Sequence, residues 1–231
     1  MAAARELLAR AERAGRGLRL DGEPLTVERI KAEVARVLAA HDATADEFIV
    51  SRGPQTAVGH DMGSGPIGAD DVVLLDLFPR DRTSACFADM TRTFVVGDPP
   101  AEEIFEFHRL SRTALERCVE TIRPGLTGKE LHAMVCSLFE QHGYPTQLSK
   151  PEGEVLRDGY YHATGHGVGL AVHEQPNIGR IGEPFVPGDV LALEPGLYRH
   201  GVGGVRLEDL VLVTDDGCEV LTDFPYDLAI T

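Results

Sequence analysis

The apolar residues of this chain recur with two different periods, and each period predicts one type of secondary structure. Spacings of three and four residues predict helices over residues 4–15, 27–40, 101–122 and 129–142. Continuous apolar runs predict strands at 47–51, 72–77, 88–96, 190–194 and 205–213, and residues 219–222 close the pattern. Residues 52–71 are predicted as a loop. Residues 159–173 are predicted as a Gly- and His-rich strand region, which a Pro- and Gly-rich link follows.

Polar residues and prolines mark the starts of three predicted helices. Thr26 precedes the second helix, where its hydroxyl can cap the first free backbone N–H groups. Thr127 and Glu130 form a T-x-x-E capping box at the fourth helix. Pro99 and Pro100 lie just before the third helix, and proline is well tolerated at a helix start. We therefore expect these three helices to begin close to those residues.

The two halves of the chain share a faint internal similarity. Residues 25–41 and 126–142 have equal length, start with Leu-Thr and end with His. Each is preceded by a predicted helix and followed by predicted strands. We interpret this similarity as a duplication, in which two hairpins are related by a pseudo-two-fold axis.

Four carboxylates occupy equivalent places in these halves. Asp76 ends the run VVLLD and is followed by Asp89, while Glu194 ends the run VLALE and is followed by Glu208. Opposed side chains on antiparallel strands lie about 4.5–5.5 Å apart, so the two hairpins are predicted to bring four acidic groups together. Groups that close cannot all stay ionised without cations, and two divalent ions balance their formal charge. The pattern predicts a dinuclear metal site.

The segment HATGHGVGLAVHE adds nitrogen ligands to this prediction. It offers three histidines, namely His162, His166 and His173. The glycines between them, at 165, 167 and 169, are expected to let the backbone approach a metal or a substrate closely.

Each acidic residue also has a purely structural interpretation. Asp76 can be a turn residue after a strand, Asp89 can cap a helix or pair with Arg92, and Glu208 can pair with Arg206. We favour metal binding because these residues occur together and in order.

Five sequence blocks resemble the signature blocks of the pita-bread metallopeptidases, the group that includes methionine aminopeptidase, aminopeptidase P and prolidase. The blocks are LLDLF, ADMTRTFVVG, GHGVGLAVHE, LEPGLY and VRLEDLVLVT, and they follow the family order over residues 5–225. The resemblance implies an α+β pita-bread fold, with duplicated helices packed on a curved antiparallel sheet. It implies one catalytic domain over residues 1–231, without the separate N-terminal domain that proline-specific relatives usually carry.

The resemblance also implies roles for individual residues. It implies metal ligands at Asp76, Asp89, His166, Glu194 and Glu208, with Asp89 and Glu208 bridging two ions. The blocks DMTRTF and RLEDLVLVT are most similar to the proline-specific branch. In that branch the substrate pocket is lined by His60, His162 and His173, and Arg206 lies next to the bridging Glu208. Oxygen-rich ligation favours Mn²⁺, and the histidine leaves Co²⁺, Fe²⁺ or Zn²⁺ open.

This constellation predicts hydrolysis of an N-terminal Xaa-Pro bond in a peptide with proline at the second position. A hydroxide shared by two metals is a nucleophile near neutral pH, and Glu194 can carry its proton to the leaving nitrogen. His173 and His60 can donate hydrogen bonds to the developing oxyanion.

Three alternatives stay open. The first is an aminopeptidase of other specificity, such as one for methionine. The others are a non-catalytic peptide-binding module of the same fold and a metal-free hydrolase of the creatinase type. The gap between Asp76 and Asp89 is 13 residues, longer than is usual in the family, so substrate preference is open too.

Composition and charge exclude several other classes of protein. The chain has 231 residues, enough for one sizeable core or at most two small ones, and no flexible linker divides it. Its net charge of -15 argues against nucleic acid or an anionic membrane as partner. The four cysteines are scattered without a CxxC pair, which favours reduced thiols in the cytoplasm. No signal peptide or membrane-spanning run is evident, and a homodimer is left open.

Overall fold

The computed structural model describes residues 1–97 and 101–230, and the described residues form four α-helices. These are α1 (Ala2–Ala9), α2 (Val27–Ala40), α3 (Glu102–Thr121) and α4 (Gly128–Gln141). Thr26 caps α2 by accepting a hydrogen bond from the Arg29 amide, and the capping box at Thr127 is present. Helices α2, α3 and α4 therefore confirm the predictions. Pro99 and Pro100, predicted to start α3, lie outside the described residues.

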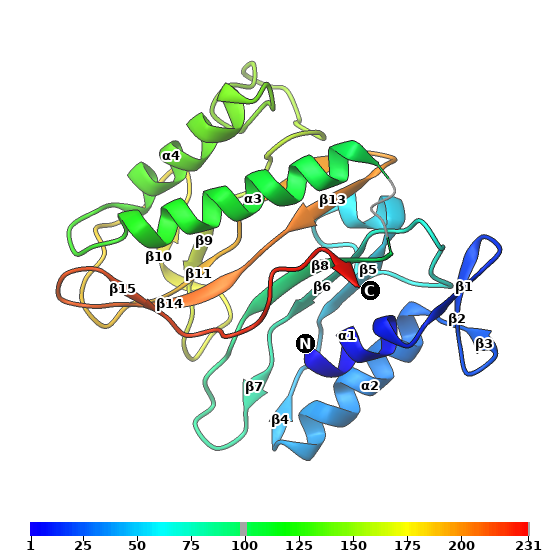
Figure 1. Cartoon of the computed structure of the whole chain (residues 1–231). Coiled ribbons are helices and arrows are strands. Elements are labelled where there is room, and N and C mark those ends of the chain that lie inside the picture. Colours follow the sequence, from blue (N-terminus) through cyan, green and yellow to red (C-terminus); the bar gives the residue numbers. More distant parts are fainter. Residues whose placement is uncertain (98–100, 231) are drawn as a thin grey trace.

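The first helix ends earlier than predicted, because turn-forming residues interrupt its apolar periodicity. After α1 the chain forms a three-stranded antiparallel sheet of β1 (Glu12–Ala14), β2 (Gly17–Leu20) and β3 (Glu23–Pro24). Gly15 lies in the turn between β1 and β2 with a φ of 60°, a conformation that favours glycine. This sheet projects from the body of the molecule (Figure 1).

Two larger sheets hold the strands of the two halves. The first has the order β16-β8-β6-β5 and the second the order β10-β9-β11-β14-β15. Their strands are β5 (Ile49–Arg52), β6 (Val73–Leu77), β8 (Met90–Val96), β9 (Gly165–Gly167), β10 (Glu174–Ile178), β11 (Val190–Leu193), β14 (Asp209–Val213), β15 (Cys218–Val220) and β16 (Ala229–Ile230). In each half, three antiparallel strands follow the pair of helices. They are β5-β6-β8 in the first half and β9-β11-β14 in the second. This repeated order is the duplication that the sequence predicts.

Short elements complete the fold. A 3₁₀-helix, η1 (Gly53–Ala57), lies within the predicted loop. Strand β4 (Ala43–Thr44) pairs with β7 (Arg80–Asp81) in the tip of the β6–β8 hairpin. Strands β12 (Gly196–Arg199) and β13 (Gly203–Arg206) form a hairpin of their own.

Two strand predictions are wrong in detail, and some strands were not predicted. Of the predicted strand region 159–173, only β9 is a strand, and β10 lies in the segment predicted as a link. The predicted strand 205–213 is divided into β13 and β14 by Leu207 and Glu208. Strand β12 was not predicted. Glu208 thus lies at a break between two strands. Its amide donates to the Thr91 carbonyl of β8 at 3.0 Å and takes no part in the ladders of β13 or β14.

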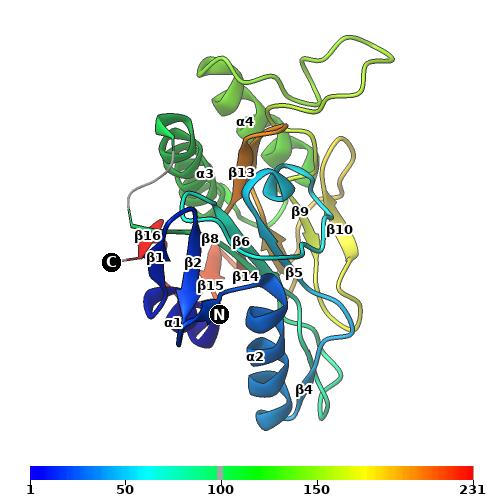
Figure 2. The same ribbon diagram turned by 90° about the vertical axis from the view of Figure 1, so that its right-hand side faces the viewer.

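Each pair of helices covers one face of one large sheet. Val73, Leu75 and Leu77 of β6 are buried in a core with α1 and α2, and β11 contributes Leu191 and Leu193 to a core with α3 and α4. Figures 1 and 2 show the two helix pairs over separate parts of the sheet structure. Because side chains alternate along a strand, Asp76 and Glu194 point to the face away from the helices.

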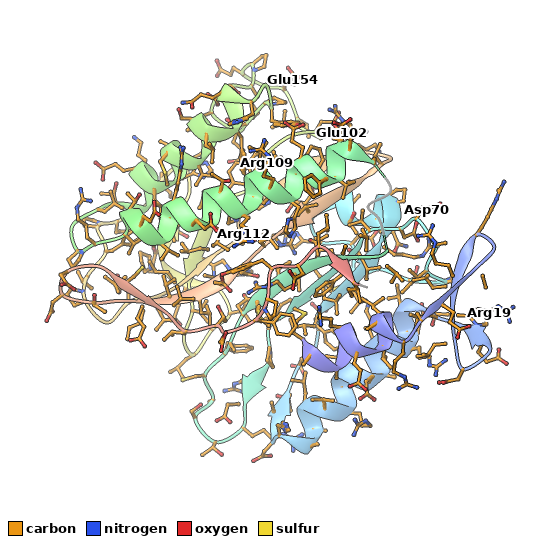
Figure 3. The ribbon with its side chains drawn as sticks, in the orientation of Figure 1. Arg19, Asp70, Glu102, Arg109, Arg112 and Glu154 are labelled. Atoms are coloured by element: carbon orange, nitrogen blue, oxygen red, sulfur yellow. The ribbon has the colours of Figure 1, made fainter. Side chains whose placement is uncertain are left out.

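The outer surface is rich in charged side chains. Figure 3 labels six of them, all exposed: Arg19, Asp70, Glu102, Arg109, Arg112 and Glu154. Among the described residues, no helix combines the length and apolar character that crossing a membrane requires.

Candidate metal centre

The candidate ligands come from both halves of the molecule and meet on the helix-free face of the sheets. Asp76 lies on β6 and Asp89 directly precedes β8. From the second half, His166 lies on β9, Glu194 follows β11, and Glu208 lies at the break between β13 and β14. Residues far apart in sequence are thus brought to one place by strand pairing.

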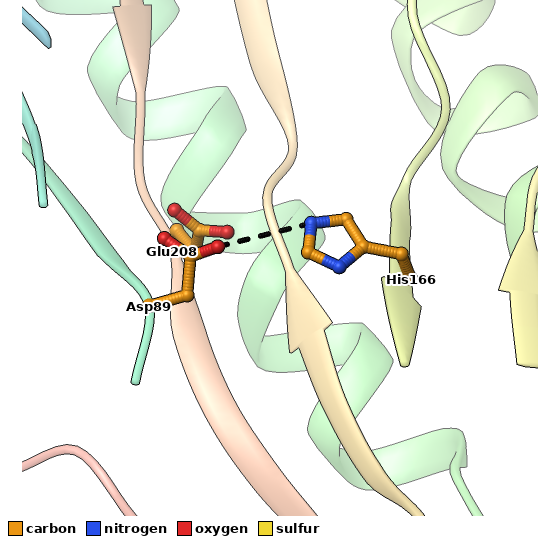
Figure 4. Close-up of side chains that lie close together, drawn as sticks. All are labelled: Asp89, His166 and Glu208. Atoms are coloured by element: carbon orange, nitrogen blue, oxygen red, sulfur yellow. Dashed lines mark ion pairs between the residues drawn. The ribbon is translucent and has the colours of Figure 1, made fainter. Parts of the chain in front are cut away.

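Three of these side chains form a compact buried group. One ligand atom each from Asp89, His166 and Glu208 lies within 4.8 Å of the others. Figure 4 shows the two carboxylates side by side, facing the imidazole of His166. Asp89 is 3% exposed and Glu208 2% exposed, so water cannot compensate their charges fully.

The tautomer of His166 suits a metal ligand. Its Nδ1 lies 3.1 Å from the Gly167 carbonyl oxygen, which can only accept, so Nδ1 carries the proton. The unprotonated Nε2 then faces Asp89 Oδ2 at 3.9 Å and Glu194 Oε1 at 3.8 Å. Burial and the neighbouring His173 lower the pKa of His166 to about 4, which keeps the ring neutral at pH 7. Three acceptors therefore face one another, as around a cation.

Asp76 and Glu194 lie beside this group and contact Arg206. An Arg206 Nη2 group donates to Asp76 Oδ2, and the Arg206 Nε atom lies 3.8 Å from Glu194 Oε2. Arg206 is 4% exposed. The single guanidinium therefore offsets part of the charge of the four carboxylates, and the rest is left for other cations.

Burial and mutual repulsion shift the carboxyl pKa values upward. Burial is the main cause for Asp89, whose pKa is raised well above its usual value, with Asp76 and Glu194 adding repulsion. The pKa of Glu208 is also raised well above its usual value by burial and then by Asp89. Burial raises the pKa of Glu194 to about 7, although Arg206 opposes the shift. The site therefore favours protons or metal ions as counter-charges.

The remaining predicted pocket histidines lie around the group. His162 donates from Nδ1 to the Ala163 carbonyl at 2.7 Å, and this nitrogen lies 4.0 Å from Glu194 Oε2. The ring of His173 stands edge-on to that of His166, with centroids 4.2 Å apart. His60 is exposed on the loop after η1, and its charge helps to lower the pKa of His173 after burial, the main cause.

The glycines of the GHGVG segment have a different role from the one predicted. An added Cβ at Gly165 would lie 1.8 Å from the Ala192 carbonyl oxygen, and one at Gly167 would lie 2.2 Å from that of Gln175. One at Gly169 would lie 2.4 Å from the Glu174 carboxylate. The close approach is therefore between neighbouring strands and a neighbouring side chain, and neither a metal nor a substrate is needed to explain these glycines.

Two residues near the carboxylates make hydrogen bonds that were not predicted from the sequence. The Thr91 hydroxyl donates to Glu208 Oε2 at 2.6 Å. The hydroxyl of Tyr198 accepts from Arg206 Nη1 at 3.2 Å and donates to His162 Nε2 at 2.8 Å. Thr91 alternates with Asp89 on one strand face, which is the signal that identifies it. Tyr198 ends the block LEPGLY, so the sequence does place it near the site, but its partners depend on strand β12, which was not predicted.

Comparison with known proteins places this geometry in a family. A sequence model of metallopeptidase family M24 matches residues 1–215. The chain belongs to metallopeptidase family M24. This M24 chain is 34% identical over 204 residues to the Xaa-Pro dipeptidase of Pyrococcus furiosus. The aligned region covers 86% of this chain and 53% of that protein. It is 31% identical over 224 residues to the probable dipeptidase PepE of Mycobacterium tuberculosis, covering 88% and 56%.

Solved structures show the same fold. The prolidase from Pyrococcus horikoshii OT3 superposes with a TM-score of 0.80 at 30% identity, covering 98% of this M24 chain and 58% of that chain. The X-Pro aminopeptidase from Thermotoga maritima MSB8 gives a TM-score of 0.76 at 29% identity, covering 89% and 56%. The fold is the α+β pita-bread fold. The chain spans about half the length of the curated relatives it matches.

The donor set of this M24 chain fits divalent metal ions. Asp89 Oδ1 is buried and has no hydrogen-bond partner in the part of the chain that the structure describes. Such an orphaned carboxylate oxygen is costly unless a cation approaches it. Together with the free Nε2 of His166, it gives the oxygen-rich, nitrogen-completed ligation that Mn²⁺ and related ions accept.

Proposed function

We propose that this chain is a catalytic domain that hydrolyses the N-terminal Xaa-Pro bond of peptides or dipeptides. The observation that carries the proposal is the buried group of Asp89, His166 and Glu208, with an unpartnered carboxylate oxygen. The relatives named Xaa-Pro dipeptidase and X-Pro aminopeptidase support the substrate class. Residues 1–231 are proposed to act as one domain, and the four free cysteines fit the cytoplasm as its compartment.

Two divalent ions, Mn²⁺ in our proposal, are held by five side chains. These are Asp76, Asp89, His166, Glu194 and Glu208, with Asp89 and Glu208 shared between the ions. Bound there, the ions would supply Lewis-acid polarisation and lower the pKa of coordinated water. The chain supplies the negative charge, the fixed His166 tautomer and the exclusion of bulk water.

The remaining site residues act on the substrate and on protons. Glu194, at the edge of the group, takes a proton from the attacking water and returns it to the leaving nitrogen of proline. His173 and His60 are exposed, so their rings can reach the scissile carbonyl oxygen and donate hydrogen bonds to it as negative charge develops. His162 lines the substrate pocket, and Arg206 holds Asp76 in orientation through the hydrogen bond described above.

Metal content and turnover of a Glu208→Gln variant test this function. The wild type is expected to bind about two Mn²⁺ per chain and to hydrolyse Ala-Pro. Glu208→Gln keeps the shape of the side chain and removes its charge, so both metal and turnover are expected to be lost. Elemental analysis and a proline-release assay measure the two effects. Glu219→Gln, an exposed substitution on β15, is the matched control and should behave as wild type.

Substrate choice is tested with a panel of Ala-Pro, Met-Ala and a longer Xaa-Pro-Pro peptide. The proposal expects the two proline-containing substrates to be cleaved fastest, because the proline nitrogen has no N–H and its ring fixes φ. Fastest cleavage of Met-Ala would replace the proposal with a methionine-specific aminopeptidase. A chain that binds no metal after purification in Mn²⁺ would instead favour a peptide-binding module.

A further inference from the structure

Arg92 is fully buried behind the metal centre, and each of its donors has an acceptor. Its guanidinium has five N–H groups, and five hydrogen bonds leave it. Nη1 donates to the carbonyl oxygens of Thr91 at 2.9 Å and Glu208 at 2.7 Å. Nη2 donates to Asp209 Oδ1 at 2.8 Å. A side chain with 0% exposure and a complete set of partners is held in one orientation.

The two carbonyl groups bound by Nη1 belong to different halves of the molecule. Thr91 lies on β8 of the first large sheet, and Glu208 directly precedes β14 of the second. No ladder pairs β8 with β14 in the described ranges, so strand pairing does not fix the distance between them. The two segments are joined instead by hydrogen bonds outside a ladder. The Glu208 amide donates to the Thr91 carbonyl, and the hydroxyls of Thr91 and Thr93 bond to Glu208 and Arg206. Arg92 adds the contact that binds a backbone carbonyl of each segment through one nitrogen.

These two anchor points determine where two candidate ligands lie. Asp89 is two residues before Thr91 on the same strand face, and Glu208 is itself the second anchor. A shift of Arg92 would therefore change the spacing between the Asp89 and Glu208 carboxylates without touching either side chain.

The C-terminal segment, residues 222–226, holds Arg92 from its other side. Nη2 also donates to the Phe224 carbonyl at 3.0 Å, and Nε donates to the Pro225 carbonyl at 3.1 Å. The ring of Tyr226 covers the guanidinium at 4.5 Å, and the Tyr226 hydroxyl donates to Asp209 Oδ2. Thr222 donates to Asp209 Oδ1 at 2.6 Å. The carboxylate of Asp209 is thereby occupied on both oxygens and keeps its ion pair with Arg92.

We propose that Arg92 is a positioning residue of the metal centre, and that the C-terminal segment 222–226 locks it in place. Arg92 sets the separation of the two shared carboxylates from the helix side of the sheet, and contacts neither metal nor substrate. This inference rests on the proposed function, in which Asp89 and Glu208 hold the ions jointly. The planar fork is essential, because a lysine has three donors on one nitrogen and cannot span both carbonyl groups and Asp209.

Mn²⁺ affinity of an Arg92→Lys variant of the whole chain tests this proposal. The variant keeps the positive charge beside Asp209 but loses the fork. Isothermal titration with Mn²⁺ alone is expected to show affinity about 10–100-fold weaker than wild type, as for other partners behind metal ligands. At saturating Mn²⁺, KM for Ala-Pro should stay within about twofold while kcat falls, because Arg92 touches no substrate.

Val34→Ala is the control for simple loss of stability. Val34 is a buried residue of α2 in the core beneath the first pair of helices, and it is none of the candidate ligands. The Mn²⁺ affinities of Arg92→Lys and Val34→Ala are compared under conditions in which both variants have lost the same melting temperature relative to wild type. Val34→Ala is expected to keep wild-type Mn²⁺ affinity. Equal affinity of the two variants would overturn the inference. If Arg92→Lys does not fold, Tyr226→Phe decides: it removes only the hydroxyl that holds Asp209, and unchanged Mn²⁺ affinity in it would also overturn the inference.

The wild type separates this inference from the proposed function. A wild-type chain that binds Mn²⁺ and leaves Ala-Pro intact refutes the proposed function, while the titrations still judge Arg92. A wild-type chain that binds no Mn²⁺ refutes both, because Arg92 then has no metal centre to position.

Discussion

Residues around the carboxylates act in two ways: some offset the negative charge of a carboxylate, and others only fix its orientation. Arg206 contacts Asp76 and Glu194, so it neutralises part of the negative charge. The Thr91 hydroxyl donates to Glu208 and fixes its orientation without neutralising it. Within residues 1–97 and 101–230, one buried oxygen of Asp89 has neither kind of partner. Asp76 thus has a positively charged partner, whereas Asp89 and Glu208 have none in this described part of the chain. This difference explains why a metal is expected at Asp89 and Glu208 rather than at Asp76 alone.

His132, a buried titratable residue outside the candidate metal centre, makes the free energy of unfolding depend on pH. His132 is fully buried on α4, where it bonds to Thr164 Oγ1 at 2.9 Å and contacts the Cys136 thiol. Burial lowers the pKa of His132 from 6.5 to about 4. Between these values the unfolded chain binds the proton and the folded chain does not. The free energy of unfolding therefore falls as pH decreases from about 6.5 to about 4.

We expect this residue to contribute up to about 3 kcal/mol of acid destabilisation. Urea unfolding of wild type and His132→Gln at pH 7 and pH 5 measures it. The variant should lose less stability between the two pH values than wild type, because glutamine does not titrate. Equal losses in both proteins would show that His132 is protonated in the folded chain at pH 5, and that burial does not lower its pKa.

At the level of elements, β9 is the strand on which the site depends most. It has three residues, pairs with β10 on one side and β11 on the other, and carries His166 in its centre. The glycines on either side of His166 let both neighbours approach closely. The strand can thus be short because its two neighbours fix it from both sides.

Gly165→Ala is expected to displace β9 and weaken the metal centre. The added Cβ would meet the Ala192 carbonyl oxygen at 1.8 Å, so the strands must separate. Overpacking of this kind costs about 1–3 kcal/mol, and His166 would move with its strand. Thermal unfolding and Mn²⁺ titration measure the two effects. Gly217→Ala, whose added Cβ would lie 4.0 Å from the Ile122 carbonyl oxygen, should change neither. Wild-type Mn²⁺ affinity in Gly165→Ala would contradict this account of β9.

The β6–β8 hairpin tip shows how the longer connection is accommodated. Leu77 still pairs with Met90, so the extra length lies beyond the ladder that carries Asp76. The tip pairs with β4 through β7, and the Phe87 amide donates to the Gly169 carbonyl at 2.9 Å. The tip therefore contacts the loop that leads to His173. We expect residues of this tip to influence which substrate is preferred.

On the scale of the whole molecule, the candidate metal centre connects the two halves. Asp89 comes from the first half, and His166 and Glu208 come from the second. Each half has its own core beneath its own helices. A cation bound between the carboxylates would hold the two cores together and stabilise the complete fold.

Mn²⁺ is therefore expected to raise the melting temperature of the wild type. A ligand at a hundred times its dissociation constant stabilises the folded state by about 2.7 kcal/mol. Differential scanning fluorimetry with and without Mn²⁺ measures the shift. Glu208→Gln should show almost no shift and Glu219→Gln the full one. A shift of equal size in all three proteins would indicate that Mn²⁺ binds elsewhere on the acidic surface.

The sequence by itself determined what depends on near neighbours. Apolar periodicity located α2, α3 and α4, and the threonines at 26 and 127 placed two helix starts. Strand alternation and the repeated halves predicted the meeting of Asp89 and Glu208. The first helix was predicted too long, to residue 15, because the apolar spacing continues beyond Ala9, where the helix ends. These features follow from local backbone preferences, which act between residues a few positions apart.

Only the tertiary structure decided which distant partners the polar side chains take. The bond between Arg206 and Asp76, the bonds of Arg92 to both halves, and the break at Glu208 involve residues far apart in the chain. The sequence allowed Arg92 to pair with Asp89, and the fold pairs it with Asp209 instead. A guanidinium can bond to any acceptor within reach, so its choice depends on which backbone segments packing brings beside it. That packing is set by the burial of two whole cores, which no local pattern encodes.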